Sequence, residues 1–168
     1  MVILQDIIII AAMAENRVIG KDNKIPWSIK EDMAHFRELT KGCPCIMGRK
    51  TWESLPKKPL PGRLNIVVSQ TMTIDSDNVK VFPSLQAAIE FCSDYEKIFI
   101  CGGETIYKQA LPLANKLELT IIRGNYEGDT FFPEIDLTCW KKINTINFDT
   151  FSFITYTKNW VSVNTKLK

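Results

Sequence analysis

The sequence predicts a single α/β domain. Its central sheet is eight-stranded, mixed and mostly parallel, it ends in an antiparallel hairpin, and four helices cover both faces. Short β-branched runs alternate with helix-like segments, which is typical of a parallel sheet between helices. Two β-rich runs near the end of the chain are separated only by Phe148-Asp149-Thr150, which favours a terminal hairpin. The 168 residues suit one domain with a substantial core.

The expected elements follow from periodicity and from breaker residues. Strands are predicted at Ile3–Ala12, Cys45–Met47, Asn65–Ser69, Val79–Phe82, Lys97–Cys101, Lys116–Ile122, Lys141–Asn147 and Phe151–Lys158. Helices are predicted at Ile29–Lys41, Arg49–Ser54, Leu85–Cys92 and Glu104–Leu111. Pro56–Pro61 is expected to be a loop. The domain is expected to span residues 1–160, followed by a polar tail at 161–168.

The composition argues against several classes of protein. A net charge of +2 gives no reason to expect nucleic-acid or membrane binding, and the apolar run Ile7–Ala12 is too short for a membrane span. Five cysteines without a Cys-x-x-Cys motif argue against a disulfide framework and a zinc site, so we expect reduced thiols in the cytoplasm. A single histidine excludes a histidine-rich metal centre, and no metal is expected.

An acidic residue interrupts the apolar face of the first predicted helix. Ser28-Ile29-Lys30-Glu31 matches a capping box that would begin this helix. The helical period then places Asp32 in the same stripe as Met33 and Phe36. Burial raises the pKa of a carboxylate, so such an acid can bind a cationic or amidine-like ligand edge, or supply a proton near neutral pH. A structural Asp bonded to the backbone is the alternative. His35 lies at the border of the stripe and is interpreted as a border residue rather than a catalyst.

Two glycine turns join a predicted strand to a predicted helix. Gly48-Arg49-Lys50-Thr51 is a near miss to a P-loop, because Gly42 and Gly48 are too far apart and Arg49 precedes the lysine. Gly102-Gly103 lacks the Gly-x-Gly-x-x-Gly fingerprint. Two such turns suggest a ligand with several phosphates. The side chains that could meet an extra phosphate are Arg49, Lys50, Ser69 and Gln70. A plain tight turn and a solvated helix start are the alternatives.

The order of the motifs resembles bacterial-type dihydrofolate reductases over nearly all of residues 3–160. The matching segments are Ala11–Gly20, Ile25-Pro26-Trp27, Asp32, Phe36, Met47–Leu55, Pro59–Arg63, Asn65–Ser69, Cys101-Gly102-Gly103 and Gly128–Pro133. The resemblance implies the corresponding fold, with an adenosine-binding lobe at roughly residues 44–95. It also implies that NADPH delivers a hydride to C6 of 7,8-dihydrofolate, with protonation at N5. The product, tetrahydrofolate, serves one-carbon metabolism and thymidylate, purine and amino-acid synthesis.

The resemblance also assigns residues toward the substrate. Asp32 would bind the pterin amino group and N3 edge and promote protonation, supported by Thr120 and by Trp27, which would hold a water. Arg63 would pair with the glutamate tail, with Lys57 or Lys58 assisting. The remaining substrate contacts implied are Ile10, Met33, Phe36, Leu55, Leu60, Cys101 and Tyr107. Dihydrofolate and antifolate-type inhibitors are the expected ligands, and a monomer is expected.

NADPH is the cofactor that the resemblance implies. The matching positions are Ala12, Ile19, Gly20, Asn23, Gly48, Arg49, Lys50, Thr51, Val68, Ser69, Gln70, Cys101, Gly102, Gly103, Glu104, Thr105, Ile106, Tyr107 and Gln109. Glu15–Lys24 matches a mobile loop over the nicotinamide, and Asp129 matches a residue that hydrogen-bonds this loop. The resemblance also implies a cis bond between Gly102 and Gly103.

The departure at Cys101 and three alternative functions stay open at this point. Cys101 stands where the family has a larger aliphatic residue, which implies either a wider, more reactive pocket wall or merely a small buried residue. The alternatives are a reductase of the same fold acting on a pyrimidine of riboflavin synthesis, a non-catalytic nucleotide or folate binder, and a P-loop kinase. Asp32, Phe36 and Arg63 together favour folate.

Overall fold

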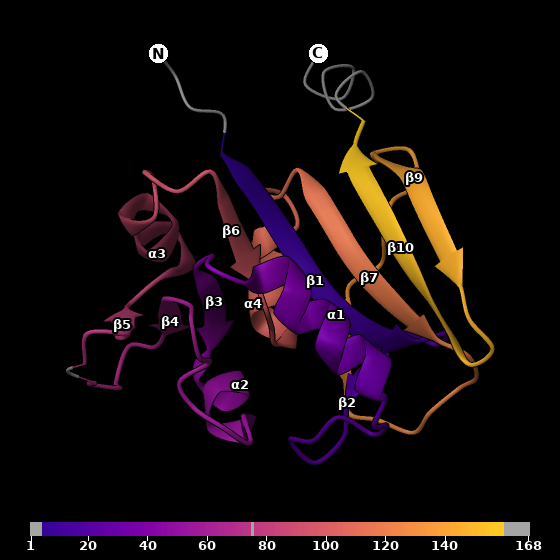
Figure 1. Ribbon diagram of the computed structural model, residues 1–168, viewed down its shortest axis with the longest axis horizontal. Helices are drawn as coiled ribbons and strands as arrows, with labels where there is room; N and C mark the ends of the chain where they lie inside the picture. The colour runs from indigo at the N-terminus through magenta and orange to yellow at the C-terminus, as the bar shows by residue number, and fades with distance from the viewer. Residues whose placement is uncertain (1–4, 75, 160–168) are drawn as a thin grey trace.

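A computed structural model describes residues 5–74 and 76–159 and confirms the predicted α/β class (Figure 1). The main sheet has the order β5-β4-β3-β6-β1-β7-β10-β9. Its strands are β1 Asp6–Ala14, β3 Cys45–Gly48, β4 Asn65–Val68, β5 Val79–Phe82, β6 Lys97–Ile100, β7 Lys116–Ile122, β9 Trp140–Asn147 and β10 Phe151–Lys158. The first six in this order pair in parallel, and the predicted hairpin β9–β10 adds two antiparallel strands.

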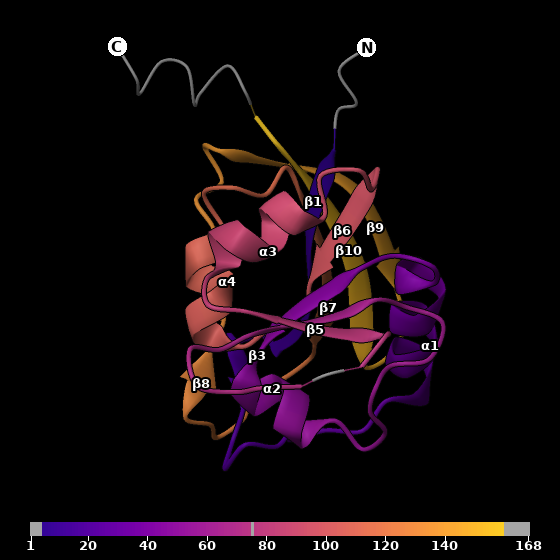
Figure 2. The same ribbon diagram turned by 90° about the vertical axis from the view of Figure 1, so that its left-hand side faces the viewer.

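Helices cover both faces of the sheet, as predicted. Their bounds are α1 Lys30–Thr40, α2 Arg49–Ser54, α3 Leu85–Phe91 and α4 Glu104–Ala110. Side chains alternate along β1: Ile9, Ala11 and Met13 pack with α3 and α4, while Ile8 and Ile10 pack on the side of α1 and α2. Figure 2 shows α3 and α4 on one side of the sheet and α1 on the other.

Several predicted boundaries are wrong by one to three residues. The strand predicted at Ile3–Ala12 continues to Ala14 and begins at Asp6; residues 1–4 and the predicted tail 161–168 lie outside the described residues. The capping box is also wrong. Ile29 is the N-cap of α1, without a side-chain cap hydrogen bond, so the helix begins one residue later than Ser28 would allow. A local Ser-x-x-Glu pattern is therefore insufficient here to place the first turn.

A small second sheet was not predicted. Its strands, β2 Val18–Gly20 and β8 Thr130–Phe131, are too short for a periodic signal and are more than 100 residues apart in the chain. The segment leading into β8 packs tightly here: a Cβ added to Gly128 would overlap Val18 Cγ1 and lie 2.7 Å from the carbonyl oxygen of Gly20. The conformation of residues 18–20 therefore depends on a distant glycine.

Gly128→Ala is expected to destabilise the protein by about 1–3 kcal/mol, the usual effect of forcing a methyl group into a packed site. Thermal and urea unfolding of the variant would measure the loss. Asn125→Ala in the same exposed segment is the matched control and should change stability little. A Gly128→Ala protein as stable as the parent would contradict the close packing.

Candidate active site

The predicted site residues converge at the carboxyl ends of the parallel strands, where α/β sheets bind ligands. Asp32, Met33 and Phe36 lie on α1, Ile10 and Ala12 on β1, and Thr120 on β7. Gly48 ends β3, and Cys101-Gly102-Gly103 connects β6 to α4. The remaining predicted residues lie on β2 and β4, on α2 and α4, or on the connections that follow β2, α2 and β4: Ile19, Gly20, Asn23, Arg49, Lys50, Thr51, Leu55, Lys57, Lys58, Leu60, Arg63, Val68, Ser69, Gln70, Glu104, Thr105, Ile106, Tyr107 and Gln109.

Asp32 and Thr120 form the predicted pair. The Thr120 hydroxyl, itself buried, donates a hydrogen bond of 2.6 Å to Asp32 Oδ1. Burial raises the pKa of Asp32 above its ordinary value, against the opposing effects of Thr120 and of the charge of His35. In the described part of the chain, Thr120 is the only hydrogen-bond donor to this carboxylate, so Oδ2 can accept a bond from a ligand. The Asp32 carboxylate can therefore accept hydrogen bonds from two adjacent donor groups of a ligand, and it can hold a proton.

Arg63 is oriented by three contacts. Its Nε–H donates to the carbonyl oxygen of Pro61 at 2.9 Å, and its NH1 donates to Thr40 Oγ1 at 3.0 Å. Its guanidinium also lies 5.8 Å from the centroid of the Phe36 ring. Thr40 in turn donates to the Phe36 carbonyl at 2.7 Å. Among residues 5–74 and 76–159 these are the only hydrogen bonds of the guanidinium, which leaves three N–H donors for a carboxylate.

The two glycine turns lie next to each other. The Gly48 N–H donates to the Gly102 carbonyl at 2.9 Å, which links the end of β3 to the start of α4. Gly102 has φ +123°, and the Gly102-Gly103 bond is cis, as predicted. A Cβ on Gly48 would lie 3.2 Å from Ile106 Cγ1, and one on Gly103 would lie 3.3 Å from Thr51 Oγ1. Side chains at these glycines would therefore crowd Ile106 and Thr51. The helices α2 and α4 both begin at these turns, and neither has a side-chain cap.

The loop before α1 is held by Asp129, as predicted. The backbone N–H of Asp22 donates to Asp129 Oδ2 at 2.9 Å, and the Asp129 N–H donates to the Gly20 carbonyl at 3.0 Å. Asp22 and Asn23 both have positive φ angles, 51° and 62°. The loop 15–24 is therefore attached to the segment that leads into β8.

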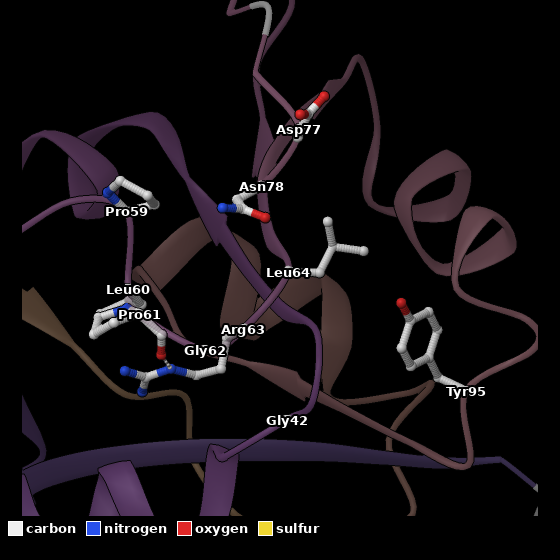
Figure 3. A pocket seen from close by; sticks show the side chains of 10 residues that line it. All are labelled: Gly42, Pro59, Leu60, Pro61, Gly62, Arg63, Leu64, Asp77, Asn78 and Tyr95. Atoms are coloured by element: carbon white, nitrogen blue, oxygen red, sulfur yellow. Dashed lines mark hydrogen bonds between the residues drawn. The ribbon is translucent and has the colours of Figure 1, made fainter.

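Two cavities flank the site without enclosing Asp32. One, of about 410 Å³, lies behind the loop that carries Arg63 and is lined on its other side by Leu64, Asn78 and Tyr95 (Figure 3). In Figure 3 the Arg63 guanidinium is turned toward Pro61, away from Tyr95. The second, of about 490 Å³, is lined by the predicted cofactor residues Ser69 and Gln70 and also by Lys80.

The thiol of Cys101 has an unusually high pKa. The neighbouring Cys45 thiol, together with burial, raises the pKa of Cys101 well above its ordinary value, and Cys101 Sγ donates to the Phe99 carbonyl at 3.9 Å. Cys101 is half-buried and packs on the same side of the sheet as Ile10, Met47 and Phe36. Nearby, the buried Tyr107 hydroxyl donates to the Ile10 carbonyl at 2.8 Å, and burial raises its pKa well above its ordinary value. Cys101 therefore lacks the low pKa that marks a reactive thiol.

Some contacts at the site were missed by sequence reasoning. The Trp27 ring meets Tyr126 edge-on at 5.1 Å, and the His35 ring stacks on Phe153 at 3.8 Å. Lys58, predicted as a possible tail contact, donates to the backbone carbonyls of Trp52 and Glu53 at the end of α2. The two ring pairs, and the approach of Lys80 to Ser69, bring together residues that are not neighbours in the sequence, so no local spacing could indicate them. Only Thr40, the partner of Arg63, had a sequence signal, because it falls in the apolar stripe of α1.

Residues 5–74 and 76–159 contain neither a cluster of metal-ligating side chains nor a membrane-spanning helix. Within these residues, no group of three or more His, Cys, Asp or Glu side chains could hold a metal ion. In the same part of the chain, no helix is both long and apolar enough to cross a membrane.

Comparison with known proteins agrees with the site geometry. The profile of the family described as dihydrofolate reductase matches residues 6–159. The dihydrofolate reductase of Neisseria gonorrhoeae is 52% identical over 136 residues, covering 81% of this chain and 84% of the relative. That of Bacillus subtilis is 42% identical over 135 residues and covers 80% of each chain.

A solved structure shares the whole fold. Dihydrofolate reductase from Enterococcus faecalis, complexed with NADP(H) and the compound RAB-propyl, superposes with a TM-score of 0.84 at 33% identity. The match covers 92% of this chain and 96% of that one. With the Asp32–Thr120 pair, the oriented Arg63 and the paired glycine turns in place, the chain belongs to the dihydrofolate reductase family.

Proposed function

We propose that Asp32, supported by Thr120, is the pterin anchor and proton-transfer centre of this NADPH-dependent reductase. The chain reduces 7,8-dihydrofolate to 5,6,7,8-tetrahydrofolate. The observation that carries the role of Asp32 is its half-buried carboxylate, which accepts one hydrogen bond from Thr120 and has a raised pKa. A pterin presents an amino group and a ring N–H side by side, which matches a carboxylate as a donor pair.

NADPH supplies the hydride that reaches C6 of the substrate. The glycine surface formed by Gly48, Gly102 and Gly103 fits such a group, because glycines let a ligand approach the backbone closely, and no side chain could be added there without crowding Ile106 or Thr51. The exposed cations Arg49 and Lys50 stand at the start of α2, beside this surface. We propose that they, with Ser69 and Gln70, bind the phosphates, and that the other predicted cofactor residues line the remainder of the site.

The chain has one proton to deliver, at N5 of the pterin. Because burial raises its pKa, Asp32 is protonated at higher pH than an exposed aspartate, and it can pass a proton through a water held beside Trp27. Thr120 keeps the carboxylate in one orientation. Ile10, Met33, Phe36, Leu55 and Cys101 form the apolar surroundings that exclude bulk water from the pterin.

Arg63 is proposed to bind the carboxylate of the glutamate tail. Its guanidinium is already oriented by Pro61, Thr40 and Phe36, so little side-chain entropy is lost when a carboxylate docks. Lys57 remains a proposed tail contact beside Leu60, whereas Lys58 is engaged with the end of α2. We further propose that antifolates bind the same pocket and that the protein is a cytoplasmic monomer.

A turnover assay with NADPH and dihydrofolate tests the activity directly. The purified protein should consume both, with a higher kcat/KM for NADPH than for NADH, and a diaminopyrimidine should compete with dihydrofolate. A folded sample that binds both ligands without turnover would instead support a binding protein. Turnover of a riboflavin-pathway pyrimidine in place of dihydrofolate would reject the folate assignment.

Thr120→Val is expected to lower kcat/KM for dihydrofolate roughly tenfold, since a hydrogen bond to a charged group is lost, typically about 1.5–3 kcal/mol. Thr120 lowers the pKa of Asp32, so its removal raises this pKa further, and the alkaline limb of the pH–rate profile should move to higher pH. Thr145→Val on the exposed strand β9 is the matched control. An unmoved profile with unchanged kcat/KM would contradict the role of Thr120.

A further inference from the structure

The helix that carries Asp32 touches the sheet through a second, unassigned contact. The imidazole of His35 lies face to face with the ring of Phe153, with centroids 3.8 Å apart and planes inclined by 11°. His35 follows Asp32 by three residues, so the two side chains project from neighbouring positions of α1. Phe153 lies directly opposite Thr120 in the register of β10 and β7. Asp32 on Thr120 and His35 on Phe153 are thus adjacent contacts between one helix and one pair of strands.

Phe153 is a firmly supported platform. Its ring packs against Phe151 at 5.3 Å and edge-on against Phe148 at 5.4 Å, and Phe151 is buried beneath the hairpin. Phe148 and Phe151 also stack on each other at 4.6 Å. Because this cluster belongs to a paired β-hairpin, the position of Phe153 is set independently of α1.

Helix α1 has few other anchors near Asp32. Its only fully buried residue is Thr40, at the opposite end of the helix. Met33, next to Asp32, is 56% exposed, and Phe36 is only half-buried. Phe36 and Leu39 pack against the core without being fully buried, so the rotation of the first turns of α1 also depends on the contacts that Asp32 and His35 make.

We propose that His35 is a positioning residue for Asp32, whose stacking on Phe153 sets the rotation of α1 at which the Asp32 carboxylate meets Thr120 and faces the substrate. The inference rests on the proposed role of Asp32. Stacking of two flat rings favours one orientation of the helix, whereas an aliphatic contact would permit sliding. His35 itself needs no contact with substrate or cofactor for this role.

The charge of His35 gives its positioning role a measurable effect on the pH dependence of Asp32. Burial lowers the pKa of His35, while the carboxylates of Glu118 on β7 and Asp32 on α1 oppose this effect. Phe153, the β10 residue in contact, carries no charge, and Glu118 is held by a 2.8 Å hydrogen bond from Thr155. A protonated His35 would lower the pKa of Asp32. A ring that cannot be protonated should therefore leave Asp32 protonated at higher pH.

Two substitutions separate the ring from its charge. His35→Leu removes the flat ring, and His35→Phe keeps a flat ring that cannot be protonated. Phe91→Leu is the matched control, because it removes an aromatic contact with Phe82 (4.9 Å) on the opposite face of the sheet. For each protein we would measure kcat/KM for dihydrofolate across the pH range, the Kd of NADPH by fluorescence, and thermal unfolding.

The expected pattern is specific to positioning. His35→Leu should lower kcat/KM for dihydrofolate roughly tenfold and leave the Kd of NADPH unchanged. The loss should be smaller than the roughly hundredfold that moving a catalytic group by about 1 Å can cause, because the Asp32 carboxylate keeps its bond to Thr120. His35→Phe should recover most of this loss, and its alkaline limb should lie at higher pH than that of the parent. Phe91→Leu should lower the unfolding temperature without changing kcat/KM.

Other patterns would overturn the inference. Equal losses in His35→Leu and His35→Phe would exclude the stack as the cause. A lower unfolding temperature with unchanged kcat/KM in His35→Leu would reduce His35 to a structural residue. Asp32→Asn, measured in parallel, separates the proposed role of Asp32 from the proposed role of His35. If Asp32→Asn loses activity and His35→Leu does not, only the His35 inference fails. If Asp32→Asn retains full activity, the proposed role of Asp32 fails and the inference with it.

Discussion

Asp32→Asn should fold and bind NADPH, yet lose roughly 10²–10⁴-fold in turnover at neutral pH, the usual contribution of a positioned acid or base. Asn can still accept a hydrogen bond from Thr120 but cannot deliver a proton to the pterin. The loss should shrink as the pH falls, because substrate that is already protonated no longer needs the carboxyl group. Steady-state kinetics across the pH range would measure both effects.

The same variant should reveal the cost of burying the charge. Burial raises the pKa of Asp32 in the folded protein above its unfolded value, so the folded state binds this proton more tightly. The stability that Asp32 contributes is therefore fully present below the unfolded pKa and is lost as the pH rises through the folded pKa. At neutral pH, Asp32→Asn should unfold at an equal or higher temperature than the parent, and this advantage should vanish in acid.

Asp94→Asn, an exposed acid between α3 and β6, is the matched control for both measurements. It should change neither turnover nor the pH dependence of unfolding. Full activity of Asp32→Asn at neutral pH would refute the proton-transfer role. An unfolding temperature that falls at neutral pH would show that the carboxylate stabilises the fold, contrary to the direction of its pKa shift.

Arg63→Gln should raise the KM for dihydrofolate by about 10- to 100-fold with little change in kcat, since charge-assisted hydrogen bonds contribute about 1.5–3 kcal/mol to ground state and transition state alike. Arg63→Lys should lose nearly as much, because an ammonium group cannot form the two parallel bonds that a guanidinium makes with a carboxylate. Steady-state kinetics with saturating NADPH would measure the KM.

A truncated substrate isolates the contact. 6-Methyl-7,8-dihydropterin lacks the benzoylglutamate and carries no carboxylate, so the parent and both Arg63 variants should have similar KM values for it. Arg37→Gln, an exposed cation on the same helix as Asp32, is the matched control and should leave both substrates unaffected. Thermal unfolding is needed beside the kinetics, because Arg63 also bonds Thr40. Equal losses with both substrates would show that Arg63 supports the fold rather than the tail.

Much of the fold could be predicted because backbone geometry imposes a local period on the sequence. Ile8, Ile9 and Ile10 alternate between the two faces of β1, and the four predicted helices all form. Asp32 was identified by the same logic, as an acid in an apolar stripe. Periodicity left it open whether that acid was structural, and only its match to a family motif suggested Thr120 as its partner.

The sequence alone thus determined the fold class, the order of the main-sheet strands and the four helices, and the presence of an acid in an apolar stripe, since each has a signal within a few consecutive residues. The tertiary structure decided the two-residue pairing of β2 with β8, the orientation of Arg63 by Thr40 and Pro61, and the stack of His35 on Phe153. The β2–β8 and His35–Phe153 contacts join residues about 110 to 120 apart in the chain, and their energy comes from side-chain packing that no local pattern encodes. Asp32 is positioned by such contacts, although its place in an apolar stripe is readable from its own helix.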